Sequence, residues 1–114
     1  MAIGEVEKRL RKVLKAMDMG DPTEFYIEEI SEDDVTYKMP NESFGLGGII
    51  TDYLQNEKNL IAAYTTGRPM SPTLEIRLKT LNNQVVFKEA LETLIGRFME
   101  LQNEWTKVTT KKKK

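Results

Sequence analysis

The sequence predicts an α+β fold: an N-terminal amphipathic helix, a small antiparallel sheet built from hairpins, and a long C-terminal amphipathic helix packed on the sheet. Three observations support this prediction. Apolar residues follow helical spacing near both ends, strand-like segments lie between them, and 39% hydrophobic with 31% charged residues suits one domain with one core. We expect a single globular domain over residues 1–108 and a disordered basic tail over 109–114.

An amphipathic helix is predicted over about residues 3 to 17. Its apolar positions recur at steps of three and four, and Gly20 before Asp21 and Pro22 indicates a stop and a turn. The apolar positions are Ile3, Val6, Leu10, Val13, Leu14 and Met17, and the opposite face carries the basic residues Lys8, Arg11, Lys12 and Lys15.

The first hairpin is predicted from EFYIEEI and VTYKM, with SEDD as its loop. Both segments are rich in aromatic and β-branched residues, which favour strands. Alternation places Phe25 and Ile27 on one face of the first strand, and Val35, Tyr37 and Met39 on one face of the second.

The segment from Pro40 to Gly48 is predicted to be a loop that leads into a short helix over Ile49 to Asn56, because it contains three glycines. Its FGLGGI sequence could in principle hold a phosphate on backbone amides. It lacks the third glycine of a dinucleotide-binding loop and the Gly-Lys-Ser/Thr of a P-loop, so a loop turning into a helix is the better interpretation.

Residues 59–66 and 73–81 are ambiguous between strand and helix. TLEIRLKTL alternates apolar and polar residues as a half-buried strand does, but its leucines also fit a helix that begins at Ser71 and Pro72. We predict two strands, because a second hairpin would complete a sheet whereas a lone hairpin is marginal. The alternative is a mostly α fold with one β-hairpin.

The last helix is predicted from an apolar stripe between Phe87 and Val108, widened by Ala90 and Ile95. A face this broad favours packing on a sheet over a narrow coiled-coil seam. The final turns lie close to the predicted tail, where we expect the domain's own sheet to have ended already. Tryptophan is also enriched at the buried anchor positions of interfaces. We therefore predict a partner or dimer interface at Phe98, Leu101, Trp105 and Val108.

Basic residues give an alternative hypothesis of nucleic-acid binding. The basic face of the first helix, with Lys8, Arg11, Lys12 and Lys15, and the tail residues Lys111, Lys112, Lys113 and Lys114 would contact phosphates. The sequence pI of about 5.6 and the absence of a nucleic-acid-binding motif argue against it.

The composition argues against catalysis. Without histidine or cysteine, the usual general base, the usual nucleophile pairs and the usual nitrogen and sulfur metal ligands are missing. We expect no enzyme activity, no cofactor and no metal site. With no apolar run of about 18 residues and no secretory leader, we expect a cytoplasmic chain without a membrane partner. The expected function is a small protein-binding module of the adaptor, chaperone or inhibitor type, acting as a homodimer.

Overall fold

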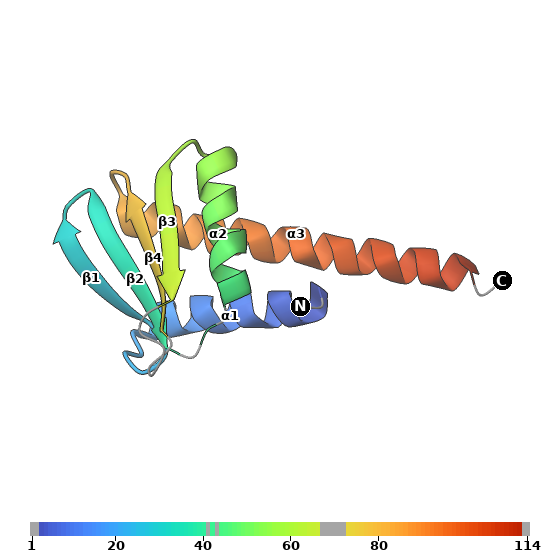
Figure 1. Ribbon diagram of the computed structural model, residues 1–114. Helices are drawn as coiled ribbons and strands as arrows, with labels where there is room; N and C mark the ends of the chain where they lie inside the picture. Colours follow the sequence, from blue (N-terminus) through green and yellow to red (C-terminus); the bar gives the residue numbers. More distant parts are fainter. Residues whose placement is uncertain (1–2, 41, 43, 67–72, 113–114) are drawn as a thin grey trace.

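The predicted α+β fold is confirmed (Figure 1). Over residues 3–40, 42, 44–66 and 73–112, which the computed structural model describes, the chain forms three helices and four strands. Side chains of the last helix are described as far as Trp105. The elements are α1 (Ile3–Met19), β1 (Tyr26–Ser31), β2 (Asp34–Pro40), α2 (Phe44–Asn56), β3 (Ile61–Thr66), β4 (Thr73–Lys79) and α3 (Asn83–Lys112).

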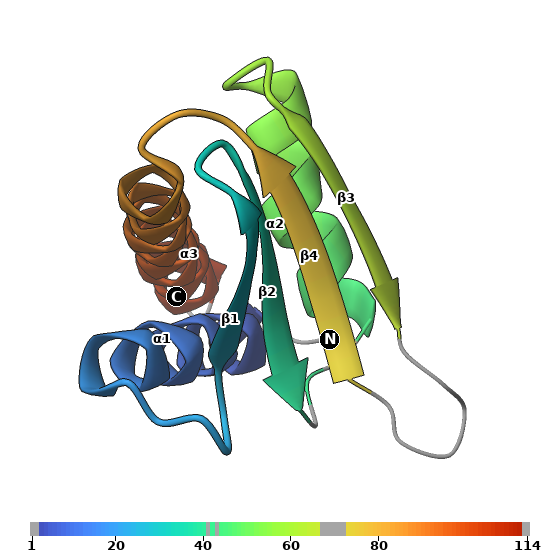
Figure 2. The same cartoon turned by 90° about the vertical axis from the view of Figure 1, so that its left-hand side faces the viewer.

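The strands form one antiparallel sheet in the order β1-β2-β4-β3. The central strands β2 and β4 pair along their whole length, from Asp34 opposite Lys79 to Pro40 opposite Thr73. The ambiguous segments are therefore the paired strands β3 and β4, and the mostly helical alternative is wrong. Figure 2 shows the helices behind one face of the sheet, while no described element covers the other face.

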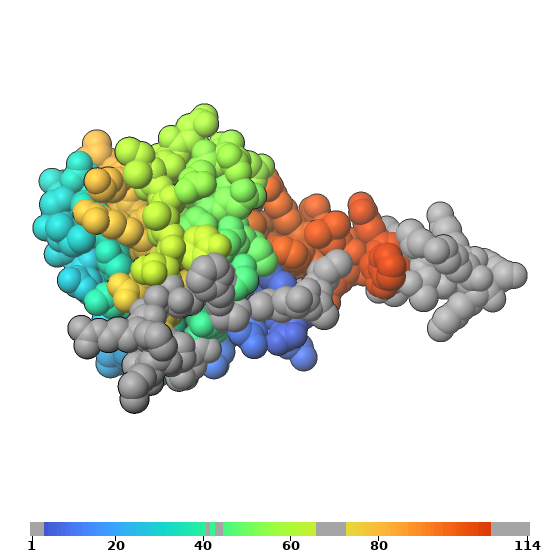
Figure 3. Space-filling view, in the orientation of Figure 1, coloured from blue at the N-terminus to red at the C-terminus, as the bar shows by residue number. Residues whose placement is uncertain are grey.

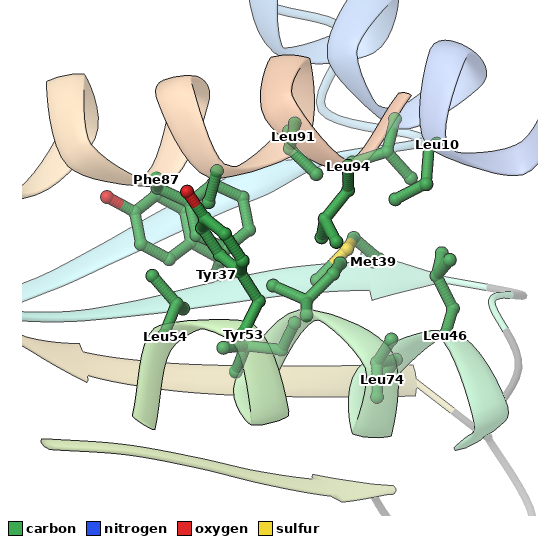
Figure 4. Close-up of a cluster of buried hydrophobic side chains, with 14 of the residues drawn as sticks. Leu10, Tyr37, Met39, Leu46, Tyr53, Leu54, Leu74, Phe87, Leu91 and Leu94 are labelled. Atoms are coloured by element: carbon green, nitrogen blue, oxygen red, sulfur yellow. The ribbon is translucent and has the colours of Figure 1, made fainter. Parts of the chain in front are cut away.

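The hydrophobic core lies between the covered sheet face and the helices (Figure 4). Tyr37 and Met39 from β2, Leu74 from β4, and Phe87 and Leu91 from α3 have no exposed surface. These residues come from the alternating positions of the strands and the apolar stripe of α3, so the sequence periodicity places them together. The predicted buried face of β2, with Val35 as its third member, is confirmed.

One buried polar link joins the sheet to the start of α3. The Tyr37 ring is stacked on Phe87 with 3.9 Å between the centroids, and its hydroxyl donates a hydrogen bond of 2.6 Å to Asn83 Oδ1. The Asn83 amide in turn donates to the Leu78 carbonyl at 2.7 Å. Burial raises the pKa of the Tyr37 hydroxyl well above its ordinary value, and the nearby charge of Glu29 adds to the effect.

α2 begins at Phe44, five residues before the predicted start at Ile49, so the glycine-rich segment is helical rather than a loop. At Gly47 a Cβ would lie 2.5 Å from Leu74 Cδ1 and 2.9 Å from Tyr64 Cδ2. Glycine is therefore needed for the close approach of α2 to β3 and β4. The prediction failed because low helix propensity was overridden by tertiary packing.

The first hairpin is confirmed, but its first strand is exposed along its whole length. Phe25 is buried just before β1, whereas Ile27 is 36% exposed and every β1 residue is exposed. The physical reason is the position of β1 at the sheet edge, where the core that covers Tyr37 on the next strand has ended.

The predicted ends of the outer helices can be compared with the structure. α1 ends at Met19, and Gly20 follows with a positive φ of 65°, as expected of a helix-terminating glycine. The α3 backbone is helical through Lys112, and so continues into the segment predicted to be a disordered tail. Lys113 and Lys114 lie outside the described residues, and the division of the chain at residue 108 stays a prediction.

Candidate protein-interaction surface

The apolar stripe of α3 changes from buried to exposed along its length. Phe87 and Leu91 are fully buried, and Leu94 is 6% exposed. Beyond them Phe98 is only partly buried, Leu101 is 46% exposed and Trp105 is 69% exposed. We call Phe98, Leu101 and Trp105 the α3 end surface; Val108, the fourth predicted interface residue, has a side chain outside those that the structure describes.

The α3 end surface exists because α3 extends past its neighbours. α1 packs antiparallel to α3: Asp18 pairs with Lys88 at 2.9 Å, and a Cβ on Gly4 would lie 2.6 Å from the Gln102 amide nitrogen. α1 therefore starts beside Gln102, and α3 continues to Lys112. Figure 1 shows the backbone of α3 extending past the start of α1, and in Figure 3 the coloured part of α3 projects from the body of the molecule.

The stripe residues at the end of α3 share one side of the helix. At 100° per residue, Leu101 and Trp105 lie within about 60° of Phe98 around the axis. The same side carries Leu91 and Leu94 in the core, so the exposed surface continues the buried one. Large apolar residues gathered on one exposed face are the usual mark of a protein-binding surface.

The basic face of α1 is partly neutralised by neighbouring carboxylates. Arg11 pairs with Glu7 at 3.2 Å, and Lys12 pairs with Glu24 at 3.4 Å. No described ion pair involves Lys8 or Lys15. The side chains of the four terminal lysines lie outside the described part, so the predicted nucleic-acid contact stays a prediction.

The free edge of β1 is an exposed surface that the sequence analysis missed. Tyr26, Ile27 and Ile30 are 40%, 36% and 54% exposed along that edge. Alternation predicts a half-buried strand here, and periodicity alone does not distinguish an edge strand from a central one. The acid-rich sequence from 21 to 34 was the available hint, because charged residues are common on sheet edges.

Within the described residues, no group of three or more acidic, histidine or cysteine side chains could hold a metal ion. The buried polar residues in this part of the chain are Thr36, Thr51 and Asn83, all uncharged. One two-contact ion pair lies on the uncovered sheet face, where the Arg77 guanidinium donates to Asp34 at 2.6 and 2.9 Å and lowers the pKa of that carboxyl.

Comparison with known proteins gives no match, either to a protein-family model or to a curated protein sequence. Within the described residues, no helix is both long and apolar enough to cross a membrane. The interpretation of the chain's function therefore depends on its own surfaces.

Proposed function

We propose that this chain is a small, non-enzymatic protein-binding module of the adaptor, chaperone or inhibitor type, which acts in the cytoplasm as a homodimer. The observation that carries the proposal is the α3 end surface. An aromatic residue 69% exposed, beside exposed and partly buried apolar neighbours on one helix face, costs free energy in water unless another surface covers it.

A second copy of the chain is a natural cover for this surface. Most homo-oligomers are two-fold dimers in which the same patch on each subunit is self-complementary. Two α3 ends crossing each other would each supply a projecting helix with an apolar face, and Trp105 would become a central anchor. The remaining exposed surfaces of the dimer would then be free to bind a client protein.

The first experiment is the mass in solution by light scattering, at low and moderate salt, with and without residues 109–114. We expect a tail-independent dimer near twice 13.1 kDa. Trp105 is the only tryptophan in the chain, so its fluorescence should shift to the blue as the dimer forms with rising concentration.

Matched variants separate the interface from the fold. Trp105→Ala should yield a folded monomer, whereas Leu81→Ala, which removes a comparably exposed side chain elsewhere, should leave the dimer intact. Leu94→Asp should unfold the domain, because it places a charge in the core. If Trp105→Ala also unfolds the chain, Trp105 belongs to its own core and the dimer proposal fails.

A monomer that co-purifies with nucleic acid removable by salt would favour the alternative function. Charge reversal at Lys8, Arg11, Lys12 and Lys15 should then abolish binding and flatten its salt dependence. A monomer at every concentration, with unshifted Trp105 fluorescence and no nucleic acid, would contradict both functions.

A further inference from the structure

β1 has one edge without a strand partner. It pairs with β2 on one side and ends the sheet on the other, so half of its backbone hydrogen-bonding groups face outward. Among the described residues, no side chain donates to or accepts from the β1 backbone. The row of free N–H and C=O groups is therefore available to another extended chain.

The opposite edge of the sheet is protected in a way that the β1 edge is not. On β3, the Gln55 side chain reaches from α2 and donates to the Ala62 carbonyl. α2 also packs closely against β3 through Gly47 and Gly48, which contact Tyr64. Coverage by a helix is one of the usual means of blocking an edge strand, and among the described elements it is present only at the β3 edge of this sheet.

A hollow lies beside the β1 edge on the helix side of the sheet. It has a volume of about 300 Å³ and is lined by Met17 of α1, Ile27 of β1 and Val85 of α3, with the Asp18–Lys88 ion pair at its wall. In Figure 2, α1 and α3 extend sideways past β1, so that parts of both helices lie beside its free edge. A fifth strand about 4.8 Å from β1 would set its inward side chains over this hollow.

The negative charge near the β1 edge favours a positively charged segment as the binding partner. Residues 21 to 34 carry seven acids and no base. Glu28 on the uncovered face of the sheet already pairs with Lys38 at 2.6 Å. Glu29 lies opposite Val35 and so shares the helix-side face with Ile27, and the side chains of Glu29 and Glu32 make no hydrogen bond or ion pair within the described residues. A second copy of β1 would place carboxylates opposite carboxylates, which is unfavourable. A basic segment would complement them.

We propose that the free edge of β1 binds an extended, basic segment of a partner protein as a fifth strand, with an apolar side chain directed into the hollow over Ile27 and Val85 and a basic side chain, two residues along on the same face, directed toward Glu29. This mode takes affinity from main-chain hydrogen bonds and specificity from alternate side chains. The site lies at the opposite end of the molecule from the α3 end surface (Figure 1), so it is independent of the proposed dimer.

The test uses the full chain and a short synthetic peptide that carries valine and lysine in turn on one face of the strand and threonine at the positions between them. Binding is followed by calorimetry and by amide NMR. We expect chemical-shift changes and slower hydrogen exchange along Tyr26–Ser31 and none along Ile61–Thr66. A peptide with the same side chains but alternate N-methylated amides should lose binding, because it keeps the charge and cannot complete the strand ladder.

Two matched variants locate the site. Val85→Lys introduces a charge at the hollow and should weaken binding by roughly tenfold or more, because an apolar contact is lost. Ile61→Lys alters a similarly exposed residue, 70% against 60%, on the other edge and should leave affinity unchanged. Far-UV circular dichroism checks that both variants fold.

Several outcomes would overturn the inference. The peptide failing to bind, the N-methylated peptide binding equally well, or Ile61→Lys rather than Val85→Lys weakening binding would each do so. A self-association that the peptide competes away and that Val85→Lys abolishes would show that a second copy occupies the edge. A Trp105→Ala monomer that still binds the peptide would support this site whatever the fate of the dimer proposal.

Discussion

The hydrogen bond from Tyr37 to Asn83 offers a sharp test of how the sheet is held to α3. Tyr37→Phe removes one hydroxyl and keeps the ring that stacks on Phe87 at 3.9 Å. The change leaves Asn83 Oδ1 buried without a donor, because the Asn83 amide stays turned toward the Leu78 carbonyl at 2.7 Å. An unsatisfied buried acceptor costs about 1–3 kcal/mol, so we expect the free energy of unfolding to fall by about 2 kcal/mol.

The assay is urea unfolding at a fixed protein concentration, since dimerisation would otherwise change the apparent stability. A thermal scan should show the midpoint falling by roughly 5–10 °C for a domain of this size. Tyr26→Phe is the control: its ring is 40% exposed, and losing its hydroxyl should change stability by less than about 0.5 kcal/mol.

A double-mutant cycle isolates the bond itself. Asn83→Ala alone also removes the contact with the Leu78 carbonyl, so it should cost more than Tyr37→Phe. In the double variant the two losses should not add, and the coupling should be about 1 kcal/mol. A coupling near zero, or a Tyr37→Phe protein as stable as the Tyr26→Phe control, would refute the role given to this link.

Two further predictions concern the ionisation of the Tyr37 hydroxyl and the substitution of two helix glycines. The pKa of Tyr37 is raised in the folded state, so the unfolded chain releases the hydroxyl proton first as the pH rises. The stability that this hydroxyl contributes is therefore present below pH 10 and is lost as the pH rises toward the folded pKa. Above pH 10 the wild type should lose up to about 1.4 kcal/mol per pH unit relative to Tyr37→Phe, measured by urea unfolding. Gly47→Ala should destabilise by about 1–3 kcal/mol through overpacking, whereas Gly96→Ala, with no atom within 4 Å of its Cβ, should stabilise by up to about 1 kcal/mol. Equal effects at both glycines would contradict the close approach of α2.

Periodicity predicted the parts of the fold in which one face of an element is continuously buried. Val35, Tyr37 and Met39 alternate along β2, and Leu91 and Leu94 recur along α3, so the pattern and the burial agree. The second hairpin was harder, because TLEIRLKTL satisfies both periods at once. The argument that a lone hairpin is marginal, rather than any local pattern, gave the correct assignment.

Position within the sheet could not be predicted from the sequence. Tyr26 to Ile30 and Val35 to Met39 have similar strand-forming composition, yet the first is an exposed edge and the second is the centre of the core. The difference arises from strand order, which depends on long-range pairing of β2 with β4. Gly47 was misassigned for a related reason: its role is set by Leu74 and Tyr64, which are distant in sequence.

The α3 end surface follows from a mismatch of lengths. Strands of six or seven residues are about 20–23 Å long, and four strands spaced about 4.8 Å apart make a sheet less than about 20 Å wide. A helix of 30 residues is about 45 Å long, so it exceeds the sheet in either direction and spans most of the 56 Å length of the molecule. An apolar stripe that keeps its period beyond the sheet cannot be buried by it. Trp105 is therefore exposed because of the length of α3, and covering it requires a surface that the described part of the chain does not supply.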